Sequence, residues 1–309
     1  MAADERASDL KPLAPGLYLV ATPIGNLEDI TLRALRVLRS VDRIACEDTR
    51  QTQKLLNHFG IETPTLSVHE HNEAARADEL IAELRDGKRI AVVSDAGMPG
   101  ISDPGSFLVK AAIEAGVAVY PVPGANAALS ALVASGLDTE RFFFLGFLPS
   151  KAGARMTELE EVRARFEEAV TLAVYEAPHR ILETLADVER VWGASCRVVL
   201  ARELTKVHEE FLRGTVSEVR ARLAERDRMR GEMVLLVEAK PGAAKGAGSL
   251  RERLAELEKT EGLNEKDALK RVAKERGVSK SELYRELQRT DRPGTRGTSR
   301  PGKSASRDS

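Results

Sequence analysis

RIAVVSDAGMPGISDPGSFLVKAAIEAG, residues 89–116, carries the clearest structural pattern of the sequence. Its first part, Arg89–Ser94, is a short apolar run typical of a buried β-strand, and Ser106–Ala115 has the pattern of a helix that ends at Gly116. The loop between them holds three glycines, two prolines and two aspartates. It is longer than the usual strand–helix connection of about 2–6 residues. Because open α/β sheets bind ligands at the carboxyl ends of their strands, this loop predicts a ligand site.

The same alternation of strand and helix extends to both sides of this stretch. Strands and helices that alternate at this spacing form parallel sheets, so we expect a parallel sheet with helices on both faces. In the first helix, three leucines should line one side and three arginines another: Leu32, Leu35 and Leu38, and Arg33, Arg36 and Arg39. The other predicted strands are 16–21, 43–47, 65–68 and 117–122, and the other helices are 29–40, capped near Asp29, 49–59, and 72–86, capped by Asn72.

The second half of the chain alternates less regularly. Only a few residues separate two of its apolar runs, 196–204 and 208–214, which suits an antiparallel pair better than a crossover connection. We therefore expect a mixed sheet. Its other predicted strands are 142–147, 170–177 and 232–239, and its predicted helices are a charged one at 156–168 and a second at 180–191.

These patterns divide the sequence into five parts. We expect a flexible leader at 1–15, an N-terminal α/β domain with a parallel sheet at 16–123, a C-terminal α/β domain with a mixed sheet at 124–240, a helical module at 241–290 and a disordered basic tail at 291–309. In the helical module, short helices at 250–259, 266–276 and 280–288 and a turn at Gly277-Val278-Ser279 indicate a helix-turn-helix shape.

The composition and the missing motifs argue against several classes of protein. The net charge of −1 means that any affinity for nucleic acid must come from local basic surface. The sequence has no G-x-x-x-x-G-K-[ST] loop, no G-x-G-x-x-G after a strand, no H-E-x-x-H and no clustered cysteines and histidines. These absences disfavour ordinary kinases, ATPases, dehydrogenases, zinc hydrolases and methyltransferases of the common Rossmann-like type.

We expect a soluble, cytoplasmic protein. The first twelve residues are charged and lack the apolar core of a secretory signal. The uncharged stretch 115–137 is interrupted by Pro121, Pro123 and Gly124, so a strand, a loop and a helix explain it better than a membrane span. Cys46 and Cys196 each lie in an apolar run and are expected to be buried thiols of a reducing compartment.

A second loop, Pro121–Ala127, follows the next strand and leads into a helix rich in alanine, leucine and serine. Its small side chains would let a flat ligand approach the backbone closely. Alone, it could equally be a hinge between two domains that proline stiffens. The loop Thr22–Asn26 has a similar position after the first strand.

Taken together, the motifs resemble those of the tetrapyrrole-methylase superfamily. They are, in order, ATPIGNLEDIT, CEDTR, SDAGMPGISDPG, PVPGANA, FLGFLP, YEAPHR, RELTK and GEMVLLVE, and they span residues 16–239. More specifically, they are similar to the bacterial branch that methylates the ribose 2′-hydroxyl of cytidine 1402 in 16S ribosomal RNA. The C-terminal helical module fits this branch too, whereas the long basic tail is the least family-like part.

The resemblance implies a homodimer of two-domain subunits, with S-adenosylmethionine in the cleft between the domains and the 30S ribosomal subunit as partner. By motif position, the methionine and ribose portions of the cofactor would contact one set of residues: Asp95, Gly97, Gly100, Ile101 and Ser102, continued by Asn126 and Ala127. Tyr175, Ala201 and Met233 would enclose the adenine, and Pro23 and Gly25 would shape the floor near the methyl group. No metal is implied.

A ribose hydroxyl is a poor acid, so a nearby base or cation would assist the transfer. Among the polar clusters at strand ends (47–50, 69–71 and 202–206) we favour four residues near the reacting ribose, without assigning their roles: Lys206, Glu203, Asp48 and Arg50. A desolvated lysine next to an arginine could have a lowered pKa and act as the base. Each cluster could instead consist of surface ion pairs and helix caps, with Asp48 and Thr49 capping a helix.

Contacts with RNA are expected mainly from the helical module, through its basic residues Lys266, Lys270, Arg271, Lys274, Lys280 and Arg285. The arginine side of the first helix is more typical of a solvated surface, and His179 could contact a phosphate or start a helix. One alternative is an enzyme of the same fold that methylates a tetrapyrrole or another small molecule. Another is a DNA-binding regulator whose α/β part senses a ligand.

Overall fold

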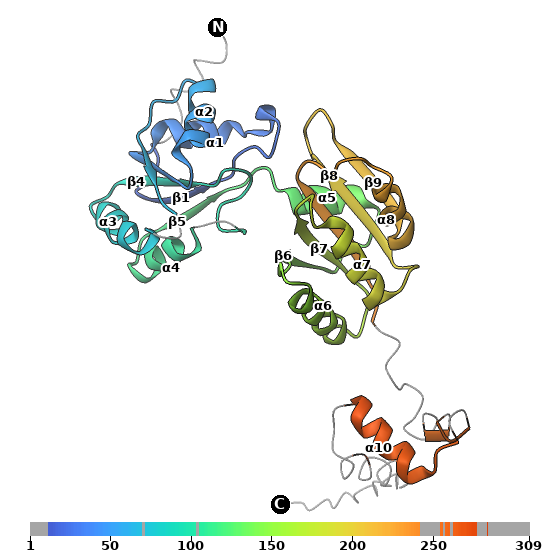
Figure 1. Ribbon diagram of the computed structural model, residues 1–309. Helices are drawn as coiled ribbons and strands as arrows, with labels where there is room; N and C mark the ends of the chain where they lie inside the picture. The colour runs from blue at the N-terminus through green and yellow to red at the C-terminus, as the bar shows by residue number, and fades with distance from the viewer. Residues whose placement is uncertain are drawn as a thin grey trace, which may run out of the picture. The chain divides into compact units, whose positions relative to one another are not determined.

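The computed structural model describes residues 12–69, 72–102, 105–241, 254–255, 257–259, 262–276 and 283 (Figure 1). The chain forms two compact units, Met1–Pro241 and Gly242–Ser309. The first unit contains two five-stranded sheets, and the second contains a small helical cluster.

All strands of the first sheet run parallel, in the order β3-β2-β4-β1-β5. This parallel sheet confirms the expectation from the strand–helix alternation. The strands are β1 Gly16–Val20, β2 Arg43–Cys46, β3 Thr65–Ser67, β4 Arg89–Val93 and β5 Val119–Val122. The helices are α1 Leu32–Ser40, α2 Thr49–His58, α3 Glu73–Arg85 and α4 Ser106–Glu114, and a 3-10 turn spans Leu27–Asp29.

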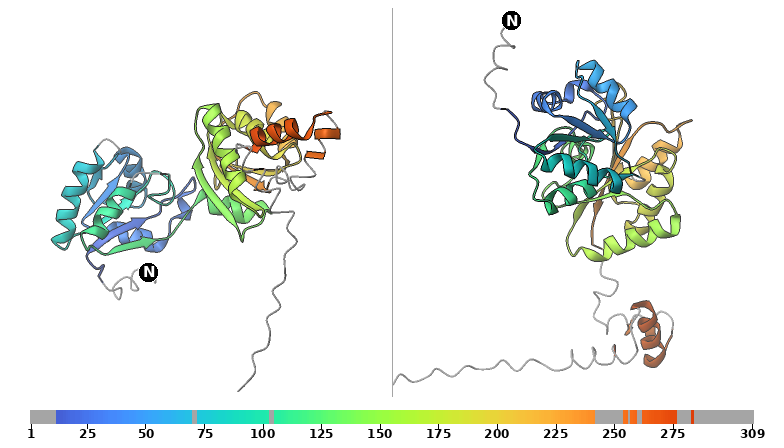
Figure 2. Two further views of the ribbon diagram at one scale, coloured as in Figure 1. Left: turned by 90° about the horizontal axis from the view of Figure 1, so that it is seen from below. Right: turned by 90° about the vertical axis from the view of Figure 1, so that its left-hand side faces the viewer.

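Helices cover both faces of this sheet, and β1 shows how the sequence divides between them. Tyr18 and Val20 pack on the face that α1 and α2 cover, whereas Leu17 and Leu19 pack on the face of α3 and α4 (Figures 1 and 2). Successive side chains of a strand point to opposite faces, so a strand buried on both sides has to be apolar throughout. This constraint explains why the sequence of β1 is a continuous apolar run.

The second sheet is mixed, as predicted, with the order β6-β7-β10-β8-β9. β6 pairs in parallel with β7, and the other pairs are antiparallel, including the expected pair β8 and β9. Its strands are β6 Phe142–Phe147, β7 Val170–Glu176, β8 Arg197–Arg202, β9 Glu210–Thr215 and β10 Met233–Ala239. One face packs on α5, Ala127–Ser135, and the other on α6 Ala152–Arg165, α7 Ile181–Trp192 and α8 Val216–Ala224.

The unit Gly242–Ser309 has one long described helix, α10, Glu265–Arg276. An apolar cluster joins this helix to residues before and after it: Leu254, Leu257, Ala268, Leu269, Val272, Ala273 and Leu283. The predicted turn Gly277-Val278-Ser279, the third helix and the tail at 291–309 lie outside the described residues apart from Leu283, as does the leader before residue 12.

Three local predictions were wrong, for separate physical reasons. Helix α1 is capped by Thr31, whose hydroxyl accepts from the N–H of Ala34, and not near Asp29. Leu32 is 86% exposed, because Ala34, Val37 and Leu38 form the buried side of α1. Asn72 precedes α3 without a side-chain cap, since its Oδ1 accepts from the N–H of His69 instead.

Two helices of the second sheet also differ from the expectation. Helix α6 begins at Ala152, four residues before the predicted start at Met156, and α8 was not predicted at all. A capping box at Thr215 and Glu218 starts α8, in which Thr215 accepts from the N–H of Glu218 and the Glu218 carboxylate accepts from the N–H of Thr215. No described helix is long and apolar enough to cross a membrane.

An ion pair at one end of the first sheet gives a stability test. The Asp42 carboxylate accepts from the Arg89 backbone N–H at 2.8 Å and from two guanidinium nitrogens at 3.0 Å each. The Arg89 hydrogen bonds hold the pKa of Asp42 at about 2, against the burial that would raise it. We expect Asp42→Asn to lower the free energy of unfolding by about 1–2 kcal/mol at pH 7.

This difference should depend on pH in one direction only. The folded-state pKa of Asp42 lies below the unfolded value of about 3.9, so the stabilisation is present above about pH 4 and disappears as the pH falls towards 2. Urea unfolding of both proteins between pH 7 and pH 2.5 measures it. Asp227→Asn, which changes an exposed carboxylate of the α8–β10 loop, is the control. An equal difference at every pH would contradict the assignment.

Candidate active site

A pocket of about 420 Å³ lies where loops of the first sheet meet strand ends of the second. Its volume falls in the range of about 300–1,000 Å³ that is usual for small-molecule sites. The first sheet contributes Ile24, Asp95–Met98, Ile101 and Ser102, and the segment before α5 contributes Asn126 and Ala127. The second sheet and its loops contribute Phe147, Tyr175–Pro178, Ala201, Leu204 and Gly231–Val234.

The loop after β4 is fastened to the loop after β1. Thr22 and Gly97 exchange two backbone hydrogen bonds, with N···O distances of 2.9 and 3.1 Å. The Thr22 hydroxyl also donates to the Ser94 carbonyl at 3.0 Å, and the Ser94 hydroxyl donates to the Gly97 carbonyl at 3.1 Å. Thr22 and Ser94 are buried, so these bonds are shielded from water. The loop is therefore fixed as it enters the pocket.

Further along, this loop meets the second sheet at Ser102. Ser102 has a φ of +59°, in the left-handed region that costs a non-glycine residue about 1–3 kcal/mol unless its surroundings hold it there. A β-bulge between Phe144 and Gly146 makes room for it, because a Cβ on Gly146 would lie 3.2 Å from the Ser102 hydroxyl oxygen. Such strain at a pocket wall is typical of a functional site.

Asp95 places a carboxylate in the pocket, next to the start of α2. Burial raises the pKa of Asp95, and the nearby Asp48 carboxylate raises it further, while a hydrogen bond from the Asp48 backbone N–H lowers it. Asp48 itself caps α2 by accepting from the N–H of Arg50 at 2.8 Å. Its pKa is lowered by the Arg50 side chain, which is 87% exposed. The two carboxylates thus lie close together at the ends of β2 and β4.

The opposite wall is apolar and built from three neighbouring strands. Tyr175 is the last residue but one of β7, Ala201 lies in β8, and Met233 begins β10, which lies between the other two strands. Phe144 and Phe147 contact the Tyr175 ring edge-to-face, with centroid distances of 5.0 and 5.6 Å. Val234 of β10 is the register partner of both Tyr175 and Ala201, so the small Ala201 and its neighbours form an apolar surface that suits an aromatic ligand.

Lys206 lies beside the pocket in a turn held by two carboxylates. Its ammonium donates to Glu203 and Glu232, at 2.9 Å each. Glu203 and Thr205 have φ values of +53° and +66°, so this turn is strained at two non-glycine residues. Gly25 gives the lysine its room, because a Cβ there would lie 2.5 Å from the Lys206 Cγ.

The structure corrects the expectation that Lys206 is a base with a lowered pKa. Burial does lower the pKa of Lys206, but the hydrogen bonds from its ammonium to Glu203 and Glu232 outweigh the burial, and the net pKa is raised. Arg202 is the arginine that was expected to lower the pKa of Lys206. It donates instead to Glu210 and to two loop carbonyls. Lys206 therefore stays a cation at neutral pH.

Most of the predicted cofactor contacts line the pocket: Asp95, Gly97, Ile101, Ser102, Asn126, Ala127, Tyr175, Ala201 and Met233. Pro23, Gly25 and Gly100 do not line it. Gly25 acts through Lys206, and Gly100 has the left-handed φ of +82° that a tight turn of the loop requires. The four predicted catalytic residues lie outside the lining, with Asp48 and Arg50 on the Asp95 side and Glu203 and Lys206 beside Leu204 and Glu232.

Sequence reasoning missed several lining residues, among them Ile24, Phe147, Pro178 and Leu204. Ile24, Phe147 and Pro178 lie within the quoted motifs ATPIGNLEDIT, FLGFLP and YEAPHR, so the motifs themselves were the available signal.

Of the arginines on α1, Arg33 donates to the Pro121 carbonyl and Arg39 to the Phe59 carbonyl, contacts that tie neighbouring loops together.

The donor set of the pocket suits a ligand with a flat aromatic part and a polar part. The apolar wall offers van der Waals contact, and the Asp95 carboxylate accepts hydrogen bonds from hydroxyl or ammonium groups. Among the described residues, no cluster of three or more histidine, cysteine or acidic side chains could hold a metal ion. Both cysteines are buried, and burial raises the pKa of Cys196 to about 11 and that of Cys46 in the same direction.

Comparisons with known proteins show the family to which the chain is similar. Residues 16–220 match the tetrapyrrole (corrin/porphyrin) methylases. The chain is 50% identical over 273 residues to "Ribosomal RNA small subunit methyltransferase I" of Halalkalibacterium halodurans, covering 87% of this chain and 93% of the relative, and 46% identical over 283 residues to the Bacillus subtilis protein of the same name, covering 87% and 92%.

The fold is also shared with a solved structure, uroporphyrin-III C-methyltransferase from Thermus thermophilus in complex with S-adenyl homocysteine. The TM-score is 0.51 at 18% identity, over 72% of this chain and 98% of that one.

Gly25→Ala tests the packing of Lys206. The added Cβ would overlap the Lys206 side chain, and overpacking of this kind costs about 1–3 kcal/mol of unfolding free energy. We expect that loss in urea unfolding, together with faster acylation of the Lys206 amine at pH 8, measured by mass spectrometry. Gly153→Ala in α6 is the control, since a Cβ at that position meets nothing within 4 Å. Unchanged stability and labelling in Gly25→Ala would refute this packing.

Proposed function

Since the chain belongs to the tetrapyrrole (corrin/porphyrin) methylase family, we propose that it is an S-adenosylmethionine-dependent methyltransferase of ribosomal RNA. More finely, it methylates the ribose 2′-hydroxyl of cytidine 1402 in 16S rRNA, acts on the 30S subunit in the cytoplasm and works as a homodimer. The support for an rRNA substrate is the name of its relatives, ribosomal RNA small subunit methyltransferase I, which are 43–51% identical over 72–90% of this chain.

The observation that carries the proposal is the pocket itself, which pairs an apolar wall with a fixed, polar loop. Tyr175, Ala201 and Met233 would hold the adenine. The Asp95 carboxylate, with the backbone of Ala96–Met98, would take the hydroxyl and ammonium groups of the rest of the cofactor. The Thr22–Gly97 hydrogen bonds keep that loop from moving, so the site requires little reorganisation on binding.

When bound, the cofactor would supply a methyl group on a sulfonium, and the neutral thioether that remains after transfer is an excellent leaving group. The chain's task is then to align the ribose oxygen and to exclude water, and alignment alone can contribute about 7–11 kcal/mol in favourable cases. The apolar second-sheet wall excludes water, and the strained Ser102 is held against the bulge at Gly146. These residues therefore act by positioning.

Lys206 would assist as a cation. Its raised pKa keeps the ammonium protonated at neutral pH, so Lys206 does not take the hydroxyl proton, which would pass to solvent. The positive charge near the ribose oxygen favours the loss of that proton from a hydroxyl that is otherwise a poor acid. Glu203 and Glu232 hold the ammonium in place at 2.9 Å each. Asp48 and Arg50, on the opposite side by Asp95, would contact the RNA strand next to the target.

The substrate is tested by incubating the protein with labelled S-adenosylmethionine and either 30S subunits or naked 16S rRNA that lacks the modification. We expect label on the 2′-oxygen of cytidine 1402 and nowhere else, mapped by nuclease digestion and mass spectrometry. Label on a base, or on a tetrapyrrole but not on RNA, would contradict the proposed substrate.

Lys206→Met tests the role of the cation. We expect kcat to fall about 10²-fold, in the range seen when one electrostatic contact to a transition state is removed, with little change in the affinity for the cofactor. Lys206→Arg should keep more activity than Lys206→Met, because the charge remains. Lys54→Met, which removes an ammonium from α2 that donates only to Gln51, is the control. Full activity of Lys206→Met would refute the role.

A further inference from the structure

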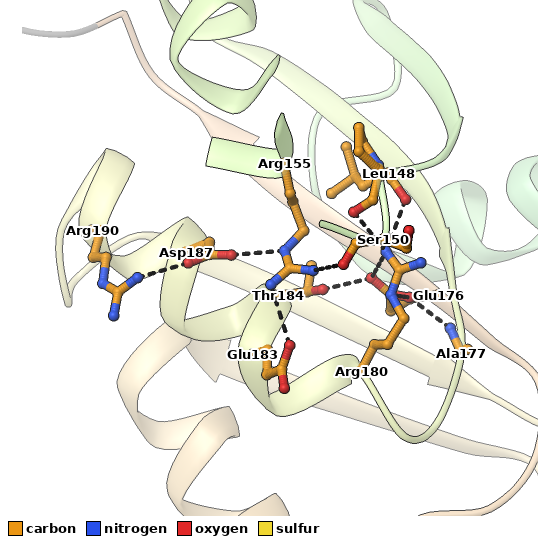
Figure 3. Close-up of polar contacts among 11 residues, drawn as sticks. Leu148, Ser150, Arg155, Glu176, Ala177, Arg180, Glu183, Thr184, Asp187 and Arg190 are labelled. Atoms are coloured by element: carbon orange, nitrogen blue, oxygen red, sulfur yellow. Dashed lines mark hydrogen bonds and ion pairs between the residues drawn. The ribbon is translucent and has the colours of Figure 1, made fainter. Parts of the chain in front are cut away.

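The second sheet buries several charged side chains that the proposed chemistry does not use. Arg155, Glu176 and Asp187 are each no more than 2% exposed. Removing charges from water costs several kcal/mol per ion, so such groups persist where hydrogen bonds and opposite charges compensate them. Figure 3 shows two groups of polar contacts, Arg155 with Asp187 and Arg180 with Glu176 and Thr184, and both groups reach the same backbone segment, residues 148–150, which joins them into one network.

The two arginines of this network hold one short segment of backbone, Leu148–Ser150, between β6 and α6. Arg180 donates to the Leu148 carbonyl at 2.8 Å and to the Pro149 carbonyl at 3.3 Å. Arg155 donates to the Ser150 carbonyl at 3.4 Å (Figure 3). Three successive carbonyls thus accept from two guanidinium groups, and that fixes the course of the segment.

The carboxylate of Glu176 anchors the network at its other end. It accepts from the Thr184 hydroxyl at 2.5 Å and from the Ala177 backbone N–H at 2.8 Å, and it forms an ion pair with Arg180. The side chain of Glu176 is completely buried, and Thr184 is 0% exposed. One carboxylate therefore fixes both the end of β7 and, through Arg180, the segment after β6.

Both fixed segments border the pocket. Phe147, directly before Leu148, lines the pocket and contacts the Tyr175 ring, and Glu176, Ala177 and Pro178 line it on the β7 side. Burial in the core alone would not require one carboxylate to fix one pocket-lining segment directly and the other through Arg180.

We propose that Glu176 and Arg180 are positioning residues for the cofactor pocket: they hold the segments at 147–150 and 176–178 where these enclose the adenosine part of the ligand. This inference rests on the proposed function. Arg155 and Asp187, joined at 2.7 Å, support the same segment from behind. The arrangement sets the affinity for the cofactor, whereas the transfer step depends on groups at the other end of the pocket.

The test is calorimetric titration of the purified full chain with S-adenosylhomocysteine, alongside urea unfolding of each variant. For Glu176→Gln and Arg180→Lys we expect the Kd to rise about tenfold, equivalent to about 1.4 kcal/mol. In methylation assays, KM for S-adenosylmethionine should rise similarly, while kcat and the KM for RNA stay within about twofold. A residue that only supports folding would lower the unfolding free energy and leave the Kd of the folded protein unchanged.

Thr184 provides a variant with little risk of misfolding. Thr184→Val keeps the shape of a buried side chain but removes the hydroxyl that donates to Glu176, so the Kd should rise about threefold, whereas Thr184→Ser should bind like the unsubstituted protein. Arg190→Gln is the matched control, because Arg190 is 68% exposed and pairs with the oxygen of Asp187 that Arg155 does not contact.

Unchanged Kd values in Glu176→Gln, Arg180→Lys and Thr184→Val would overturn the inference while leaving the proposed function intact. If the unsubstituted protein itself failed to bind S-adenosylhomocysteine, the proposed function and this inference would fall together.

Discussion

The pair of backbone hydrogen bonds between Thr22 and Gly97 is the contact on which the rest of the site depends. It joins the loops that follow β1 and β4, which are adjacent in the sheet, and the Thr22 and Ser94 hydroxyls reinforce it from a buried position. From there the chain carries Ile24 and Asp95 to the pocket on either side of the junction. Glycine at 97 is required because the junction needs a φ of +86°.

The second sheet completes the site by a different principle, which is the burial of charge. Its wall facing the ligand is apolar, but the segments that frame this wall are held by buried carboxylates and guanidinium groups. At the other edge of the pocket, two glutamates hold the partly exposed ammonium of Lys206 in a strained turn. Because these charged side chains are already held in position, they do not have to rearrange when the ligand binds. The site is therefore preorganised.

The sequence predicted the fold and most of the pocket because these depend on local patterns. Apolar runs that end in a long loop rich in glycine and proline identify both the sheet and its ligand-binding edge. Contacts between distant residues could not be inferred in this way: Lys206 binds Glu232, and Arg155 within the charged helix α6 is buried against Asp187 of α7. Leu32 was misplaced because the leucine pattern of α1 also fits a helix rotated towards Ala34 and Val37, which is the one that packs.

Binding of the methyl donor in this pocket can be seen in a crystal structure of the full chain with S-adenosylhomocysteine. We expect the adenine against Tyr175, Ala201 and Met233, with the polar part of the ligand at Asp95 and the backbone after it. A ligand bound elsewhere on the protein, with this pocket empty in the same crystals, would contradict this expectation.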